Sequence, residues 1–460
     1  MRLNGQRRMK LLPAAKNWRG RGRIMVKALR ARQISTGCAL KIGVAAAAVM
    51  LSAGTAFAGA FAPREQSVVF QGTSFAGSAA GGVLSSMFWN PAALGQFDGV
   101  NSESAYSLIL PDTEITTTPS ALFGSGSSRS SGDIGDTAVL PASYFSYQLN
   151  DKLVFGMGVN APFGLTTDGN YSWDGARLAR ESKITTYNFT PTLAYRVAPG
   201  VIIGAGVQVQ YIDAQLRAAA NSAFGPTSAI KGDDWGFGFT AGILLSPTDG
   251  TSIGLGIRSK LDQNLEGTFH VAGALTPRPI SADITLPEIV TLSLRQDIAP
   301  AWTLLGTVEW TNWSRLPELL VTCDNAIPGL CGAGGPLGGA PLSLNWEDGW
   351  FFSAGVEHAY SDKLTLRAGA AYEKSPIQSA EGRTLRLPDS DRVWASIGAS
   401  YKYSEWTTLD VAYSHLFVED ARTVQDLGPA TGVYRGEVES SADIISVGVR
   451  SKLDWLLSGN

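Results

Sequence analysis

Histidine is the side chain most often used to move protons near neutral pH, and this chain of 460 residues holds only three. They are His270, His358 and His415, in distant segments. A nucleophilic serine would need a histidine within hydrogen-bond reach, and no nucleophile motif lies near any of them. The sequence also lacks a Walker-type phosphate loop and any convincing spacing of metal ligands. We therefore predict that the protein is not an enzyme and that it has no catalytic residue, metal or cofactor.

The N-terminus has the pattern of an export signal. In ALKIGVAAAAVMLSAGTAFA, Lys41 precedes a short apolar run that ends in AFA at Ala58, which is the order of a secretory signal and its cleavage site. A transmembrane anchor is the alternative, but the run is short and rich in alanine. We predict a signal peptide over residues 1–58, with Met25 as an alternative start.

Removal of this leader makes the chain acidic. Residues 1–58 hold twelve of the 37 basic residues and none of the 40 acidic ones, so the mature chain would have 25 basic and 40 acidic residues, a formal charge of −15. Binding to phosphate backbones requires basic patches, so nucleic acid is not expected as a partner.

Two cysteines remain in the mature chain, Cys323 and Cys331, in the stretch CDNAIPGLCGAGGPLGG. One close pair in a loop of an exported protein suggests a disulfide. Zinc is a poorer alternative, because no histidine and only one carboxylate, Asp324, lie nearby.

Much of the mature chain alternates between apolar and polar residues. In AWTLLGTVEW (301–310), the even-numbered residues from Trp302 to Trp310 are apolar, whereas most of the odd-numbered ones are polar. Successive side chains of a strand point to opposite faces, so this segment has one apolar face. Similar segments predict fourteen strands at 100–111, 137–149, 152–160, 183–198, 200–215, 233–246, 250–271, 280–298, 301–314, 341–360, 362–375, 391–404, 406–418 and 432–454.

The connections between these segments alternate in length. QLNDKL, RVAPGV, AYSDKL and KYSEWT are tight, whereas the segments around 112–136, 161–182, 216–232, 315–340, 376–390 and 419–431 are long, as in outer-membrane barrels with short periplasmic turns and long extracellular loops. No apolar run of the roughly 18 residues that a membrane helix needs follows residue 59. Residues 100–460 therefore predict an all-β fold, a transmembrane antiparallel β-barrel of about 14 strands in the bacterial outer membrane with its apolar face toward lipid.

Residues 59–99 differ from the rest. They are rich in small residues and show no sustained period of two or 3.6, which predicts a compact, irregular segment.

Several stretches resemble FadL-type outer-membrane transporters of long-chain fatty acids and aromatic hydrocarbons. They are NAPFGLTTDGNYSWDGARLARESKITTYNFTPTLAYRV (160–197), FWNPAALGQF (88–97), GIRSKLDQNLEGTF (256–269) and LPDSDRVWASIGASYKYSEWTTLDVAYSHLF (387–417). The family fold is a fourteen-stranded barrel plugged by an N-terminal hatch, so the resemblance implies a hatch at residues 59–99. The chain departs from the usual aromatic C-terminus of such barrels, because LDWLLSGN continues past Trp455.

The resemblance also implies functional residues in the hatch. The family's Asn-Pro-Ala triplet lies near an inward kink of a barrel strand, and this kink opens a lateral gap through which an apolar ligand enters the membrane. The triplet corresponds to Asn90, Pro91 and Ala92. The neighbouring residues could line the ligand path or pack within the plug, and they are Met87, Phe88 and Trp89.

A long-chain acid would also need cations for its carboxylate. One candidate pair is Arg258 with Lys260, on one face of a predicted strand. Another group, Arg177, Arg180 and Lys183, lies near a loop-to-strand junction. The alternative is that these residues are ordinary lumen or loop charges, paired with acids or solvated.

The expected function is passive uptake of long-chain fatty acids or similar hydrophobic compounds by a monomer. Capture at extracellular loops, hatch-gated movement and lateral release through the barrel wall would deliver these small molecules to outer-membrane lipid. A general diffusion porin is the alternative, although a porin would constrict its channel with an inward-folded loop. An outer-membrane lipid hydrolase is less favoured. Fatty acid and aromatic hydrocarbon both remain open as substrates, since both need only an apolar path.

Overall fold

The computed structural model describes residues 59–119, 128–219, 227–273, 277–323, 342–427 and 432–456. The predicted signal peptide, its alternative start Met25 and one partner of the predicted disulfide, Cys331, lie outside these residues. Among the described residues, no helix has both the length and the apolar composition to cross a membrane.

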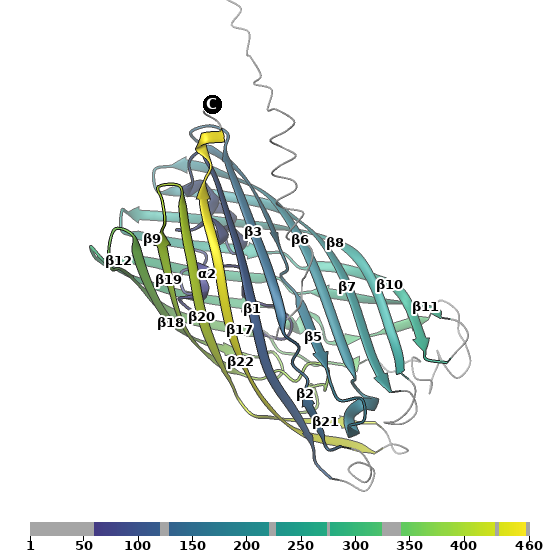
Figure 1. Ribbon diagram of the computed structural model, residues 1–460. Helices are drawn as coiled ribbons and strands as arrows, with labels where there is room; N and C mark the ends of the chain where they lie inside the picture. The colour runs from purple at the N-terminus through teal and green to yellow at the C-terminus, as the bar shows by residue number, and fades with distance from the viewer. Residues whose placement is uncertain are drawn as a thin grey trace, which may run out of the picture. The chain divides into compact units, whose positions relative to one another are not determined.

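Antiparallel strands form one closed sheet (Figure 1). The first strand, β1 (Val100–Thr117), pairs with the last, β22 (Val433–Lys452), along nearly its whole length, so the sheet has no free edge at this seam. Between them the described residues form the remaining barrel strands, some of them in two pieces: β2 (Ser130–Asp133) with β3 (Ala138–Gln148), β4 (Leu153–Asn160) with β5 (Gly164–Asp168), β6 (Glu181–Ala198), β7 (Val201–Ala219), β8 (Thr227–Thr248), β9 (Thr251–Arg258) with β10 (Leu261–Val271), β11 (Arg278–Leu286) with β12 (Ile289–Ala299), β13 (Trp302–Thr311) with β15 (Val321–Cys323), β17 (Gly349–Ala359), β18 (Leu364–Lys374), β19 (Arg392–Lys402), and β20 (Thr407–Val418) with β21 (Ala421–Asp426). Two short strands, β14 (Glu318–Leu319) and β16 (Leu342–Ser343), pair only with each other.

The predicted all-β barrel of fourteen strands is confirmed, and so is the predicted orientation of its faces. On β7, the side chains of Ile203 and Val207 are 45% and 52% exposed, whereas Gln208 and Gln210 are 1% and 0% exposed. Apolar side chains therefore lie outside and polar side chains inside, the reverse of a water-soluble protein. Such an outer face suits a lipid solvent.

The two ends of the barrel differ in their connections. At the short-turn end, the connections are 149–152, 199–200, 249–250, 300–301, 360–363 and 403–406. At the other end, which we call the long-loop end, segments such as 375–391 and 169–180 are longer, and the latter contains the 3₁₀ helix η4 (Asp174–Arg177). Further 3₁₀ turns are η5 (Trp313–Arg315) at the long-loop end and η6 (Asp454–Leu456) after β22.

Residues 59–99, which we call the N-terminal segment, lie within the ring of strands (Figure 1). The segment contains only α2 (Val68–Gln71), η2 (Leu84–Phe88) and η3 (Pro91–Gln96), and most of its residues are buried. Many of its backbone groups bond to each other in short turns, and others bond to the wall: Gly77 N–H donates to Thr307 Oγ1 (2.9 Å) and Ala79 N–H to Ser293 Oγ (3.0 Å). A buried backbone group needs such a partner, which explains the irregular conformation.

The two faces of β13 should respond differently to a charge. An arginine at Val308, on the outer face, should impair assembly, because an arginine near the bilayer midplane costs about 2–4 kcal/mol. The matched control is Thr303→Arg, which would place the same charge beside the luminal acids Asp297 and Glu357. Assembly is measured by electrophoresis, because a folded barrel migrates differently before and after it is heated. Equal losses from the two variants would contradict the assignment of faces.

Candidate functional site

An apolar pocket of about 120 Å³ lies inside the barrel near the long-loop end. The side chains that line it come from several strands and from the loops above them, and they include Leu165, Ile212, Leu265, Ile284 and Leu344. Such a lining can bind a hydrocarbon chain, since each buried methylene contributes about 0.8 kcal/mol.

The N-terminal segment contributes to this pocket through Phe61. The ring of Phe61 is 3% exposed and lies edge-on to Trp313, with centroids 4.9 Å apart. It also contacts Phe163 (6.0 Å) and Trp346 (6.1 Å). Any movement of the start of the segment would therefore change the shape of the pocket.

Several hydrogen-bond donors line this otherwise apolar pocket: the exposed Lys231, which pairs with Asp213 (3.3 Å), Ser281, Thr384, Trp346 and Arg386. Arg386 donates through Nη1 to the backbone oxygens of Glu181 and Arg217 (both 3.1 Å) and to Ser182 Oγ (3.2 Å), and no carboxylate of the described residues pairs with it. Burial lowers the pKa of the Arg386 guanidinium to about 10, so it stays protonated at neutral pH. The indole Nε1 of Trp346 has no hydrogen-bond partner among the described residues. Each of these two groups can donate a hydrogen bond to the acid group of a bound ligand.

The barrel wall is interrupted beside the pocket. β4 ends at Asn160 and β5 begins at Gly164, and both pair with β6. On the other edge of β4 and β5, the pairing of β4 with β3 ends at Ser143–Val159, and the next pair is the isolated bridge Gly135–Thr167. Residues 138–142 of β3 therefore have β1 as their only strand partner among the described residues.

The start of the N-terminal segment bonds to this interruption. Gln66 donates through Nε2 to the backbone oxygen of Ala161 (3.0 Å), and its own backbone oxygen accepts from the hydroxyl of Tyr144 on β3 (2.9 Å). The backbone N–H of Gly164 donates to Phe61 O (2.8 Å). The segment thus supplies, from inside, hydrogen bonds that a neighbouring strand would supply in a continuous sheet.

The Asn-Pro-Ala triplet anchors another part of the segment. Asn90 is fully buried, and its Nδ2 donates to Ala79 O (2.8 Å) and to Ile243 O on β8 (3.0 Å), while its Oδ1 accepts from Ala92 N–H (3.0 Å) and so caps η3. Pro91 is the first residue of η3, a position for which its fixed φ is suited.

The wall opposite the triplet is built from glycine. A Cβ added to Gly204, Gly242, Gly254 or Gly256 would overlap atoms of the segment, including the Asn90 side chain and the Trp89 backbone oxygen. Glycine at these positions lets the segment approach the backbone of β7, β8 and β9.

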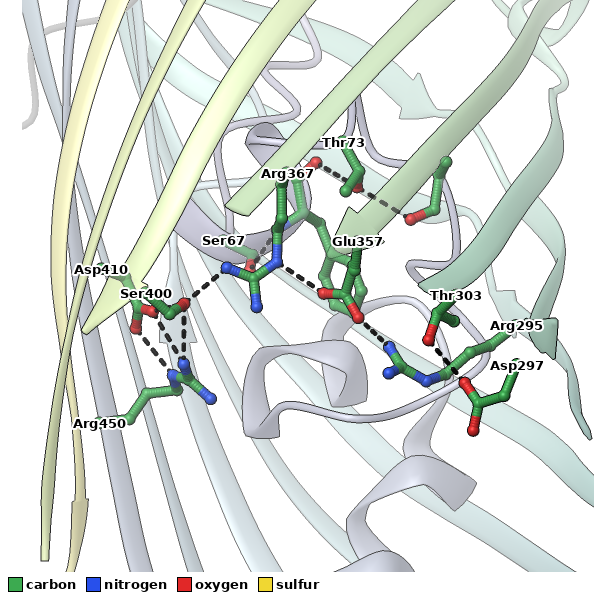
Figure 2. Close-up of polar contacts among 12 residues, drawn as sticks. Ser67, Thr73, Arg295, Asp297, Thr303, Glu357, Arg367, Ser400, Asp410 and Arg450 are labelled. Atoms are coloured by element: carbon green, nitrogen blue, oxygen red, sulfur yellow. Dashed lines mark hydrogen bonds and ion pairs between the residues drawn. The ribbon is translucent and has the colours of Figure 1, made fainter. Parts of the chain in front are cut away.

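A second cavity, of about 730 Å³, lies between the segment and the wall at the short-turn end, and its lining is charged (Figure 2). Glu357 accepts from Arg295 (2.5 Å) and Arg367 (2.6 Å). Arg367 and Arg450 both donate to Ser400 Oγ, at 2.6 and 3.1 Å. The cavity is larger than the apolar pocket, but an apolar ligand in it would displace water from charged groups without replacing the lost hydrogen bonds.

Comparison with known proteins identifies the family. A model of the outer membrane protein transport protein family (OMPP1/FadL/TodX) matches residues 49–453. The chain belongs to this family. It is therefore an outer-membrane transport protein rather than an enzyme, and its short-turn end corresponds to the periplasmic side.

Relatives and solved structures agree with this membership. The chain is 27% identical to outer membrane protein P1 of Haemophilus influenzae, over 81% of this chain and 88% of that protein. It is 25% identical to a long-chain fatty acid transport protein of Escherichia coli, over 77% and 85%. The fold is similar to that of a Pseudomonas aeruginosa FadL homologue (TM-score 0.74, 21% identity, covering 85% of this chain and 99% of that one) and of the Pseudomonas putida toluene transporter TodX (TM-score 0.61, 16% identity, 87% and 99%).

The residues beside the triplet are buried away from the apolar pocket. Met87 is 1% exposed and packs in the core formed by the segment and the wall. Phe88 and Trp89 line a separate cavity of only about 30 Å³. Their role in a ligand path stays a prediction.

The structure does not bring Arg258 and Lys260 together on one face, as the sequence pattern predicts. β9 ends at Arg258, which is 4% exposed, donates to Phe88 O (3.1 Å) and lies 4.2 Å above the Phe88 ring. Lys260 lies in the break before β10, is exposed and pairs with Asp262 (2.7 Å). Arg258 therefore holds the N-terminal segment, and Lys260 faces solvent.

The other predicted cations do not line the apolar pocket. Arg180 is buried and bonds to Thr227 Oγ1 (2.8 Å) and Tyr171 O (3.1 Å). Arg177 ends η4 and is partly buried, whereas Lys183 is exposed on β6.

The disulfide prediction also stays untested, since Cys331 lies outside the described residues.

Sequence reasoning missed Phe61, Gln66, Trp346 and Arg386. A signal for the segment was available, because Arg64 and Glu65 are its only charged residues before Asp98. Two adjacent charges in such a stretch mark a point of contact with the wall. The sequence gives no such indication for Arg386, which lies in a loop immediately before the family-like stretch at residues 387–417.

The glycine wall should be sensitive to single methyl groups. Gly256→Ala would force its Cβ against Trp89 O, so the segment should shift and stability should fall by about 1–3 kcal/mol, as in other overpacked sites. Gly306→Ala is the matched control, since its Cβ would have only Ser353 O nearby, at 3.8 Å. Hydrogen exchange of residues 85–95 and thermal unfolding measure the effect. If both variants behave like the parent, the segment is not held by this wall.

Proposed function

We propose that this protein takes up long-chain fatty acids, or similar hydrophobic compounds with an acid group, and releases them sideways into the outer membrane. The observation that carries the proposal is the position of Phe61. This side chain lies against the pocket, and its backbone oxygen accepts from Gly164, beside the interruption of the wall. One movement could therefore release the ligand and open its exit.

The ligand would enter between the long loops and bind in the apolar pocket with its acid group at Arg386. An unpaired guanidinium in such a pocket costs desolvation energy that an acid ligand would recover. An aromatic hydrocarbon would leave this cost uncompensated. The curated relatives named as long-chain fatty acid transport proteins point the same way.

The polar cavity at the periplasmic end favours lateral over axial exit. A hydrocarbon chain that moved straight on would leave an apolar pocket for a cavity lined by ion pairs, at a cost of about 0.8 kcal/mol for each methylene that becomes exposed to a polar environment. A chain that moved through the interruption would pass from an apolar pocket into lipid. The lateral path therefore avoids most of the barrier.

The N-terminal segment would act as the hatch, with a fixed part and a moving part. The triplet, anchored on the glycine wall, would hold the fixed part. Residues 59–66, which contact both the pocket and the interruption, would move. Packed segments switch between discrete arrangements, so a small shift suffices. Transport would be passive, driven by the concentration gradient and by trapping of the product downstream.

Binding of an acid and of the matched alcohol tests this function. Arg386→Gln should weaken binding of a long-chain fatty acid about 10- to 100-fold, the effect of losing one charged hydrogen bond, and should leave binding of the corresponding fatty alcohol unchanged. Arg386→Lys should restore part of the loss. Lys183→Gln, the exposed cation on β6, is the control and should have no effect.

Equal loss for acid and alcohol would mean that Arg386 only shapes the pocket. No effect on either ligand would place the acid group elsewhere. Preferential binding of an aromatic hydrocarbon by the parent protein would contradict the proposed substrate class.

A further inference from the structure

Of the two charged residues at the start of the N-terminal segment, Arg64 is paired with acidic side chains, whereas Glu65 lacks a hydrogen-bond partner among the described residues. Arg64 pairs with Glu309 on β13 (2.5 Å) and with Glu373 on β18 (3.0 Å), and it lies 3.7 Å above the ring of Phe351. Glu65 is 1% exposed, and neither of its carboxyl oxygens has a hydrogen-bond partner among the described residues. A buried carboxylate without partners is costly, so this residue requires an explanation.

The nearby charges act on Glu65 in both directions: Glu373 raises the pKa of its carboxyl, whereas Arg64 and Arg392 lower it. The charged groups that act on it are Arg64 of its own segment, Glu373 of β18 and Arg392 of β19. Arg392 in turn pairs with Asp389 and Glu373. The ion-pair cluster thus contains two cations and three carboxylates: Arg64, Arg392, Glu309, Glu373 and Asp389. An ionised Glu65 would add a fourth carboxylate to this buried cluster and so increase its excess of negative charge. Burial raises the pKa of the Glu65 carboxyl to about 7.

Glu65 lies next to the residues that hold the interruption of the wall. Gln66, the next residue, bonds to Ala161 and Tyr144. Arg64, the preceding residue, ties the segment to β13 and β18. A charged Glu65 would compete with Glu309 and Glu373 for the Arg64 guanidinium, so its charge acts directly on the contacts that seat the segment.

We propose that Glu65 is a proton-binding site that controls the hatch: the seated segment holds the proton, and its loss releases residues 59–66 from the wall. This inference rests on the proposed gating role of the segment. The proton leaves to water, and no other bond forms or breaks. Uptake would then respond to the pH of the compartment that the opening segment meets.

The direction of the pH effect follows from linkage. The seated state binds the Glu65 proton more tightly than a solvated carboxyl does, for which the ordinary pKa is 4.5. The extra stability of the seated state is fully present below pH 4.5, decreases as the pH rises and is lost above about 7. Across this window the ratio of open to seated segment rises by up to about tenfold per pH unit.

The experiment uses the full-length mature protein in liposomes at pH 5 and pH 7.5. Hydrogen exchange of the peptide covering residues 59–72, corrected for the intrinsic pH dependence of exchange, measures opening. Uptake of a long-chain alcohol, whose charge does not change with pH, measures transport. The variants are Glu65→Gln and, as a matched control, Glu103→Gln, because Glu103 is also buried but accepts from Ser85 N–H (2.9 Å). Heat-modifiable mobility verifies that each variant is folded.

The parent and Glu103→Gln should open more at pH 7.5 than at pH 5, whereas Glu65→Gln should remain closed at both. Opening that is independent of pH in the parent, or a pH response that persists in Glu65→Gln, would overturn the proposal. If opening depends on pH through Glu65 but uptake does not follow it, the proton site stands and the gating role of the segment fails.

Discussion

The structure depends on one constraint: an irregular stretch of chain enclosed in a barrel must satisfy, on the barrel wall, the backbone polar groups that its own turns leave unpaired. The wall meets this requirement with hydroxyl groups, such as Thr307 and Ser293, and with glycines that allow close approach. Each of these hydrogen bonds contributes only about 1 kcal/mol, but leaving one unmade in a buried site costs more. The segment as a whole is therefore fixed, and any movement of it must break contacts with the wall.

The same segment divides the lumen into two environments. On the long-loop side, Phe61 and its aromatic neighbours border an apolar pocket, whereas on the short-turn side Arg295, Arg367 and Glu357 line a polar cavity. This asymmetry is the physical reason for proposing a sideways exit, because the interruption after Asn160 adjoins the apolar side. The proposed proton site lies where these features meet, between Arg64 and Gln66.

The strands and their faces could be predicted because alternation is a local property that each segment shows by itself. The Asn-Pro-Ala triplet was found by resemblance, and the structure adds that Asn90 bonds to the wall at Ile243. The pair Arg258 and Lys260 shows where local reasoning fails. Even-numbered residues face inward on β9, but after the break at residues 259–260 the odd-numbered residues Leu261 and Gln263 do so. A shift of one residue reverses the faces, and alternation alone does not reveal it.

The pocket cation without a carboxylate partner, Arg386, and the partnerless carboxylate of Glu65 could not be predicted, because both depend on contacts between distant parts of the chain. Arg386 reaches the pocket through a loop that meets Glu181 and Arg217, about 170 to 200 residues away in sequence. Glu65 is isolated only because Glu309, Glu373 and Asp389 already occupy the nearby cations.

The central claim is that residues 59–66 must move for an apolar ligand to leave through the wall. A reducible bifunctional thiol reagent that joins cysteines placed at Gln66 and Ala161 tests this claim most directly, because the Gln66 side chain reaches the Ala161 backbone. With the cross-link formed, ligand binding should persist and uptake into liposomes should stop, and reduction should restore uptake, while the parent protein shows no effect of the reductant. Undiminished uptake with the cross-link in place would contradict the account.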